Sequence, residues 1–341
     1  MGIDRYGSDG NEDQLATVMG ALRRRVLTPD VSATRLKTRG FHDKGTWARE
    51  VLETVGESFL TGLGDAVETA SPDVTDRRLS ALPTRYRGFA YEGAAMGFTL
   101  LDGLLPGRHR TDAFLRGVGA PHVYMAYVGI GWGMARLPRF LWPDTRKLDP
   151  LLRWLVHDGY GFHQAYFHTE RYVHGHARDD RAARWTGDGA YALRAADQGI
   201  GRALWFVGGT DVDQVTRLVE GFVDARRPDL YSGVGLAATY AGGASEEELR
   251  RLLDRAGEHR GSLAQGGAFA AEARVRPGLV VPHTELGTSV LCGTDAERAA
   301  RVSRALRPDA TILAHDPLHP PYETWRAGIA RELTSHEGGP T

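Results

Sequence analysis

The sequence predicts an all-α protein built from stacked helical hairpins. Glycine makes up 43 of the 341 residues, about twice its usual share of roughly 7%. The glycines gather in apolar segments rich in small residues, and these segments alternate with charged, amphipathic ones. Part of this pattern returns at a fixed spacing, because Gly199 to Gly233 and Gly208 to Gly242 are both steps of 34 residues. Repeats of this length are typical of stacked helix pairs.

Residues 1–85 are predicted to form a helical N-terminal extension. The stretch 47–60 has a helical pattern, and Pro29, Pro72 and Pro83 separate the helices around it. The body of repeats is expected over residues 86–327. The last segment, 328–341, ends in Glu-Gly-Gly-Pro-Thr and is predicted to be a disordered tail.

The inner helices of the repeats are predicted from segments that are apolar on all sides and therefore buried. Their small residues let helix backbones approach closely, or else leave room for a ligand. The segments are 88–96, 128–135, 159–163, 199–207, 233–241 and 266–273.

Short glycine turns are expected to join these inner helices to amphipathic outer helices. Ser245 with Glu248, and Thr294 with Glu297, have the spacing of a capping box, and Thr210 with Asp213 is a weaker version. Apolar residues follow at helical spacing in 212–222 and 249–256. The repeat is broken once, between Gly242 and Gly293.

Two arrangements of the hairpins fit this pattern, an open superhelix of the tetratricopeptide type and a closed α/α toroid. The superhelix is favoured because 34 residues are few for a toroid hairpin. The only β-like run of note is 279–283, and Pro282 interrupts it.

Composition excludes several classes of protein. With 42 basic and 43 acidic residues, overall charge offers no argument for binding nucleic acid or an anionic membrane. A single cysteine, Cys292, excludes an intrachain disulfide and a cysteine-cluster metal site. No apolar run reaches the ~20 residues of a membrane helix. Residues 1–14 are polar, without the apolar core of a secretory signal, so a cytoplasmic protein is expected.

Several blocks of the sequence resemble a bacterial family described as domain of unknown function 1702. The resemblance spans roughly residues 20 to 330. Members of that family occur in natural-product gene clusters, including enediyne polyketide cassettes. The resemblance therefore implies a specialised-metabolite protein with an apolar, polyunsaturated ligand, and it assigns no catalytic residues. The blocks are 87–96, 158–163, 201–207, 232–237 and 282–286.

Candidate catalytic residues are polar side chains within or beside the apolar segments. A buried carboxyl has its pKa raised by desolvation, or lowered if an arginine pairs with it, and a raised pKa would suit a general acid toward a polyene or an epoxide. The alternative is a set of ion pairs and hydrogen-bonded histidines that tie the repeats together. These candidates are Glu92, His163, Arg202, His283 and Glu285.

Aromatic side chains beside glycine are candidates for a pocket that binds a flat or polyunsaturated ligand, although most aromatics simply pack in cores. Aromatic faces also stabilise a carbocation. The predicted pocket residues are Tyr91, Trp132, Phe162, Trp205, Tyr240, Gln265 and Phe269.

No cofactor is predicted, and metal binding is expected only under one alternative. Asp179 with Asp180, or Asp211 with Asp213, would hold Mg²⁺ and a diphosphate in an isoprenoid enzyme. The second pair is better explained as negative charge in a first helical turn. The Gly-x-Gly sequences lack the strand of a dinucleotide site, and Cys292 is interpreted as a core residue.

Three functions are compatible with these sequence features, in order of preference. The first is an enzyme that binds and transforms or cyclises an apolar polyene. The second is an isoprenoid cyclase or transferase that uses magnesium. The third is a non-catalytic helical scaffold for other proteins of a biosynthetic complex.

Overall fold

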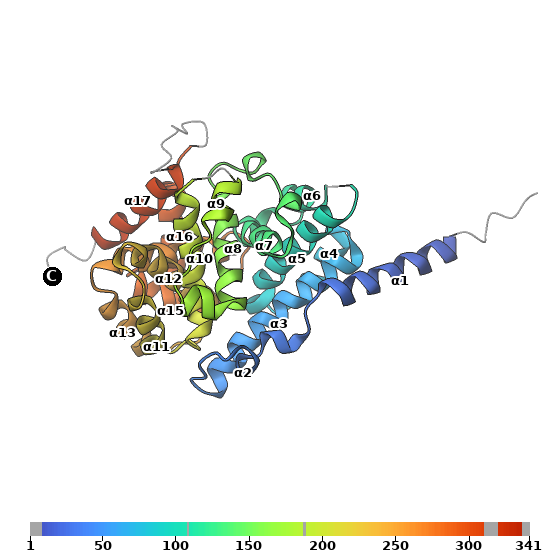
Figure 1. Cartoon of the computed structure of the whole chain (residues 1–341). Helices are drawn as coiled ribbons and strands as arrows, with labels where there is room; N and C mark the ends of the chain where they lie inside the picture. Colours follow the sequence, from blue (N-terminus) through green and yellow to red (C-terminus); the bar gives the residue numbers. More distant parts are fainter. Residues whose placement is uncertain (1–8, 108, 187–188, 310–319, 336–341) are drawn as a thin grey trace, which may run out of the picture.

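The predicted all-α fold is confirmed by a computed structural model that describes residues 9–107, 109–186, 189–309 and 320–335 (Figure 1). This part of the chain contains helices and no β-strand. Within it, no helix has both the length and the apolar character needed to cross a membrane.

Seven helices pack side by side in chain order and form the core of the molecule. They are α3 (Thr46–Thr69), α5 (Thr84–Leu104), α7 (Val123–Arg136), α8 (Trp154–Phe167), α10 (Tyr191–Val207), α12 (Arg227–Ala241) and α14 (Arg260–Val275). The other α-helices are α1 (Asp9–Leu27), α2 (Leu36–Arg39), α4 (Pro72–Leu79), α6 (Arg110–Arg116), α9 (Asp180–Thr186), α11 (Val212–Glu220), α13 (Glu246–Ala256), α15 (Pro282–Leu291), α16 (Ala296–Ala305) and α17 (Pro321–Ser335).

The Gly-x-Gly sequences mark the points where neighbouring core helices cross. Residues two apart lie about 200° apart around a helix, so the two glycines face opposite neighbours. A β-carbon at Gly199 would lie 1.8 Å from the carbonyl oxygen of Asp158 on α8. One at Gly201 would lie 2.1 Å from that of Leu230 on α12. The same two-sided contact recurs at Gly129 and Gly131, Gly159 and Gly161, and Gly233 and Gly235.

The outer helices α11 and α13 lie where the amphipathic pattern predicts them, and the capping box of Ser245 and Glu248 is present. The other two caps differ from the prediction by one residue. Asp295 caps α16 instead of Thr294, and its carboxylate accepts from the Arg298 N–H at 2.7 Å. Asp211 caps α11 in the same way. The glycine turns leave these aspartates at the helix starts, where a carboxylate is the stronger acceptor.

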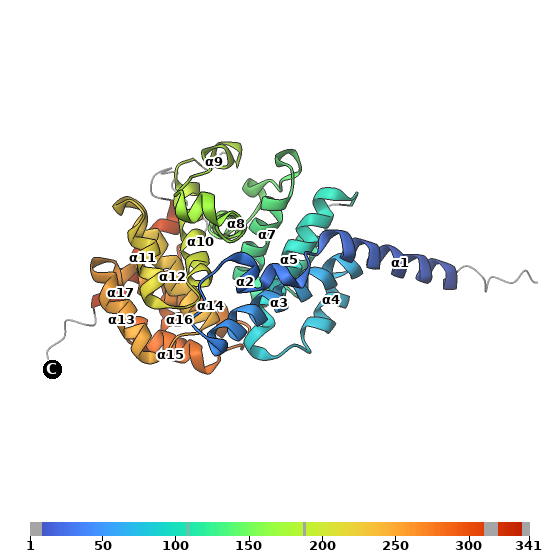
Figure 2. The same cartoon turned by 60° about the horizontal axis from the view of Figure 1, so that its bottom comes forward.

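The row of core helices is tightly curved, so its last helices, α12 and α14, come into contact with α5 (Figure 2). The rings of Phe89 on α5 and Tyr240 on α12 are 5.0 Å apart. Arg274 on α14 donates to the carbonyl oxygen of Arg85 at 2.9 Å. Side chains from α5, α7, α8, α10, α12 and α14 therefore meet on the concave side.

The predicted terminal segments join this row of helices. In the N-terminal segment, α3 crosses α5 at Gly62, where a β-carbon would lie 1.8 Å from the carbonyl oxygen of Ala90. The tail prediction is wrong for residues 328–335, because they continue α17 and bury Ile329 and Leu333. Residues 336–341, the rest of the predicted tail, lie outside the described part of the chain.

Candidate functional site

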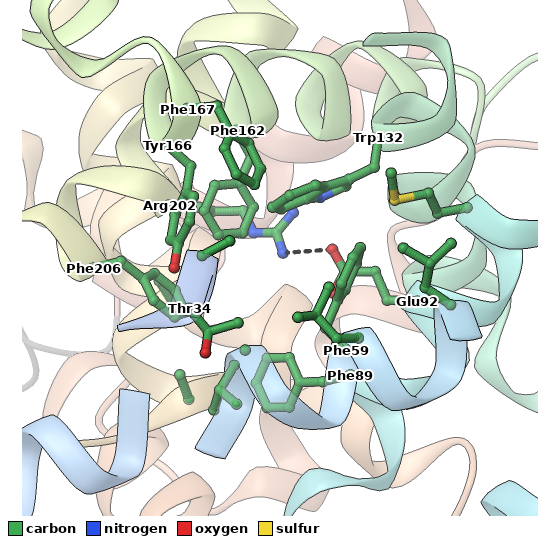
Figure 3. A pocket seen from close by; sticks show the side chains of 18 of the residues that line it. Thr34, Phe59, Phe89, Glu92, Trp132, Phe162, Tyr166, Phe167, Arg202 and Phe206 are labelled. Atoms are coloured by element: carbon green, nitrogen blue, oxygen red, sulfur yellow. Dashed lines mark ion pairs between the residues drawn. The ribbon is translucent and has the colours of Figure 1, made fainter. Parts of the chain in front are cut away.

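A narrow cavity of about 60 Å³ lies between the core helices on the concave side of the row (Figure 3). Its wall comes from α3, α5, α7, α8, α10 and α12, and Ala33 and Thr34, just before α2, close one side. The wall is mostly apolar and strongly aromatic. Its aromatic residues include Phe59, Phe89, Trp132, Phe162, Tyr166 and Phe206.

One carboxyl group, from Glu92 on α5, and two guanidinium groups, from Arg202 on α10 and Arg136 on α7, line this cavity. Glu92 and Arg202 point toward each other (Figure 3), while Arg136 donates to the carbonyl oxygen of Leu27 at 3.3 Å. The closest atoms of the facing pair, Glu92 Oε1 and Arg202 Nη2, are 3.6 Å apart, longer than a good hydrogen bond. Arg202 Nη1 donates to Asp158 Oδ1 on α8 at 2.5 Å. Arg202 is 3% exposed and both acids are 1% exposed. Two buried carboxyl groups therefore share one guanidinium.

The close helix crossings bring these three residues together. Glu92, Asp158 and Arg202 each stand directly beside a crossing glycine in the sequence. The carbonyl oxygen of Glu92 is the atom that faces Gly129, and that of Asp158 faces Gly199. Because these backbones nearly touch, side chains from α5, α8 and α10 can reach one another.

The burial of Glu92, Asp158 and Arg202 determines which of the two carboxyl groups carries a proton. The pKa of Glu92 is raised to about 7: desolvation raises it most, the charge of Arg202 opposes this rise, and the charge of Asp158 adds to it. Burial also raises the pKa of Asp158, again against the effect of Arg202. A guanidinium with one positive charge balances one carboxylate, and its shorter contact is to Asp158. Glu92 is therefore the acid that carries a proton near neutral pH.

Asp158 was missed as a candidate, although the same signal was available. It is an acidic residue directly before an apolar Gly-x-Gly segment, as Arg202 is a basic residue directly after Gly201. Phe89 and Phe206 lie in the glycine-rich segments 88–96 and 199–207, so the signal that selected Trp132 was available for them too. Phe59 and Tyr166 lie outside those segments, and only the curvature of the row brings α3 to the cavity.

Of the predicted pocket residues, Trp132, Phe162 and Tyr240 line the cavity together with the predicted Glu92 and Arg202. The Arg202 guanidinium lies over the Phe162 ring, 4.8 Å from its centroid. His163 packs behind Trp132, with ring centroids 5.4 Å apart, and is not part of the wall. Its burial lowers its pKa to about 3, so it is neutral at physiological pH.

The other predicted pocket residues pack elsewhere in the core. Tyr91 stacks on His122 with ring centroids 3.7 Å apart and donates to Asp76. Trp205 donates to the carbonyl oxygen of Gly242 at 2.9 Å. Phe269 packs on Trp325. The side-chain oxygen of Gln265 accepts hydrogen bonds from Ser232 and Arg326.

The two catalytic candidates on α15 are also away from the cavity. His283 Nε2 lies 2.9 Å from the carbonyl oxygen of Tyr240, and burial lowers the pKa of its ring to about 4. Glu285 is exposed and accepts from the Ala296 N–H at 3.0 Å, at the start of α16. Both side chains are therefore placed to stabilise helix ends.

The four aspartates of the metal hypothesis do not come together. Asp179 accepts from Tyr160 and from the Ala182 N–H, and Asp180 is exposed on α9. Asp211 caps α11, while Asp213 pairs with Arg255 at 3.2 Å. Within the described ranges, no group of three acidic, histidine or cysteine side chains is arranged to hold a metal ion.

Comparison with known proteins agrees with the sequence resemblance. The family model described as Protein of unknown function (DUF1702) matches residues 18–333, so the chain belongs to that family. No curated protein and no solved structure matches the chain.

Proposed function

We propose that the protein binds a slender, apolar, polyunsaturated molecule in the aromatic cavity and isomerises or cyclises it by proton transfer from Glu92. One observation carries this proposal: an aromatic cavity contains a carboxyl group whose pKa is about 7. General acids are most effective when their pKa lies near the working pH. The resemblance to a family from natural-product gene clusters favours a polyunsaturated substrate.

The proposed reaction begins when the Glu92 O–H gives its proton to one carbon of a double bond. A C–H bond forms, and the neighbouring carbon becomes positively charged. A second double bond attacks that carbon and closes a C–C bond. The new cation then returns a proton to the Glu92 carboxylate, so the product is an isomer of the substrate and no oxidant or reductant is needed.

The rest of the cavity supports these steps. The faces of Phe59, Trp132 and Phe162 line the cavity and would stabilise a cation that water must not reach. Arg202 would stabilise the carboxylate that Glu92 becomes after it gives up its proton. Because the cavity is narrow, we expect the substrate to be a thin chain. We also expect the side chain of Thr34, which closes one side of the cavity, to move when the substrate enters.

Native mass spectrometry of the full chain, purified from its producing host, tests the proposal. We expect a retained apolar molecule in the wild type and in Glu92→Gln. Material extracted from the variant, given to fresh wild-type protein, should become an isomer of equal mass, with Glu92→Gln at least ~100-fold slower. A protein that holds no small molecule but carries a second polypeptide would instead favour the scaffold function.

A further inference from the structure

Three polar atoms on the cavity residues are buried and have no hydrogen-bond partner within the described part of the chain. They are Oε1 of Glu92, Nε1 of Trp132 and the hydroxyl oxygen of Tyr240. Buried polar groups in folded proteins are nearly always paired, so unpaired atoms around one cavity call for a partner inside it. Thr34, Arg136 and Tyr166 also bring polar groups to the wall, but none of them is hydrogen-bonded to these three atoms.

These atoms belong to one side of the cavity. Arg202 Nη2 lies 3.6 Å from Glu92 Oε1. The indole of Trp132 is also close enough to lower the pKa of Glu92, although neither contact has the geometry of a hydrogen bond. The hydroxyl of Tyr240 lies against Gly88, where a β-carbon would come within 1.9 Å of it. Gly88 is one helical turn before Glu92 on α5. The polar atoms are therefore gathered along α5, and the far wall is aromatic.

The chemistry of these three groups and of the neighbouring Arg202 identifies what would pair with them. The indole N–H of Trp132 and the guanidinium of Arg202 can only donate, while a protonated Glu92 and the Tyr240 hydroxyl can both donate and accept. They fit an acceptor. A negatively charged acceptor at this end would lie beside Glu92 and near Asp158, whose charge already balances that of Arg202. The second guanidinium of the wall, that of Arg136, donates to the carbonyl oxygen of Leu27. A neutral oxygen is the better match.

We infer that the ligand of this cavity is an otherwise apolar polyene that carries a neutral acceptor oxygen, an epoxide or a carbonyl, at the end that meets Glu92. This inference rests on the proposed function and names the substrate class of the same site. A pure hydrocarbon would leave the N–H of Trp132 and the O–H of Tyr240 unpaired when it displaces water, and this would weaken its binding.

The oxygen also changes where the proton goes. The Glu92 O–H gives its proton to the ligand oxygen instead of to an alkene carbon. In an epoxide the C–O bond breaks and its electron pair stays on the oxygen. In a carbonyl the π pair moves to the oxygen. Either way a hydroxyl group forms, the adjacent carbon becomes cationic, a double bond attacks it to form a C–C bond, and a proton returns to Glu92.

Matched probes test the inference. Isothermal titration would compare a linear ten-carbon triene with two derivatives of equal chain length, a terminal epoxide and a terminal methyl ketone. For the wild type we expect at least one derivative to bind about tenfold more tightly than the hydrocarbon. Tyr240→Phe and Trp132→Phe should each reduce this preference several-fold. Trp47→Phe, at a side chain that is 56% exposed, should leave it unchanged.

The outcomes separate this inference from the proposed function. Equal affinity for all three probes would overturn the inference, since the polar atoms would then be paired by water, and would leave the proposed polyene site standing. A preference that survives in both cavity variants would also overturn it. Binding of none of the probes would contradict both proposals.

Discussion

Glu92 and Arg202 face each other across the cavity at 3.6 Å, yet Oε1 of Glu92 has no hydrogen bond within the described chain. The reason is that Arg202 makes its short contact with Asp158 instead. A buried pair with ideal geometry would hold the glutamate ionised and inert. This looser geometry leaves Glu92 with a pKa near neutrality and one free oxygen facing the cavity.

The protonation of Glu92 should make the protein less stable at alkaline pH. Its pKa is raised from 4.5 to about 7 on folding, so the folded state keeps a proton that the unfolded state releases between these values. Stability from this group is present below pH 4.5 and is lost as pH rises through 7, by about 3 kcal/mol in total. Urea unfolding at pH 5 and pH 8 would measure it.

Glu92→Gln is the control for this measurement, because the amide does not titrate. Histidines with lowered pKa values, such as His163, change stability in the opposite direction and affect both proteins equally. The difference between wild type and variant therefore isolates Glu92. Parallel stability curves for the two proteins would contradict a raised pKa at this position.

Asp158→Asn should lower the pKa of Glu92. The charge of Asp158 raises that pKa, and its removal frees Arg202 to pair with Glu92 alone. At pH 7 a smaller fraction of Glu92 would be protonated, and the alkaline limit of activity would move to lower pH. Infrared spectroscopy of the protonated carboxyl band, with Glu92→Gln to assign it, measures the shift directly.

Asp211→Asn is the matched control for Asp158→Asn, since Asp211 caps α11 and does not line the cavity. It should leave the carboxyl band of Glu92 unchanged. Asp158 is a positioning residue in this proposal, so a loss of activity at every pH without a shift of the band would assign it a purely structural role.

Gly199→Ala should destabilise the protein by about 3 kcal/mol or more, because its β-carbon would lie 1.8 Å from a backbone oxygen of α8. The two helices must separate, which also moves Asp158 away from Arg202. Thermal and urea unfolding measure the loss. Gly328→Ala, within α17, is the control: its β-carbon would lie 3.8 Å from Cδ1 of Leu306, an ordinary contact, so it should stabilise by about 0.5–1 kcal/mol.

The thiol of Cys292 should not react in the folded protein. Burial raises its pKa to about 12, and Sγ donates to the carbonyl oxygen of Ala264 at 3.2 Å. A thiolate is the reactive form, and almost none is present at pH 8. Labelling with a thiol reagent should proceed only after unfolding in urea. Rapid labelling of the native protein would show that α15 opens locally.

Much of the fold could be predicted because it depends on local patterns. The helical spacing in 212–222 and 249–256, and the capping box at Ser245, follow from neighbouring residues alone. The tail was assigned wrongly because α17 gains its stability from packing, through Trp325, Ile329 and Leu333. The last six residues remain outside the described structure.

The site was predicted only in part. Glu92 and Arg202 were recognised because a charged residue inside an apolar segment must find a partner. Glu285 was selected by the same argument, and His283 because it follows Pro282 in a predicted first helical turn. Both serve helix ends, a role that spacing cannot distinguish from catalysis. Tyr91 and Phe269 stand beside small residues like Trp132, yet Tyr91 packs on His122 and Phe269 on Trp325, and neither lines the cavity.

The sequence by itself determined the helices, their caps and their burial, because backbone propensity and apolar periodicity act over a few residues. It also determined the close crossings, since only glycine allows helix backbones to touch at Gly199 and its counterparts. The tertiary structure alone decided that the row curves until α5 faces α10 and α12. That curvature sums many long-range contacts, and it joins Glu92, Asp158 and Arg202 in one cavity.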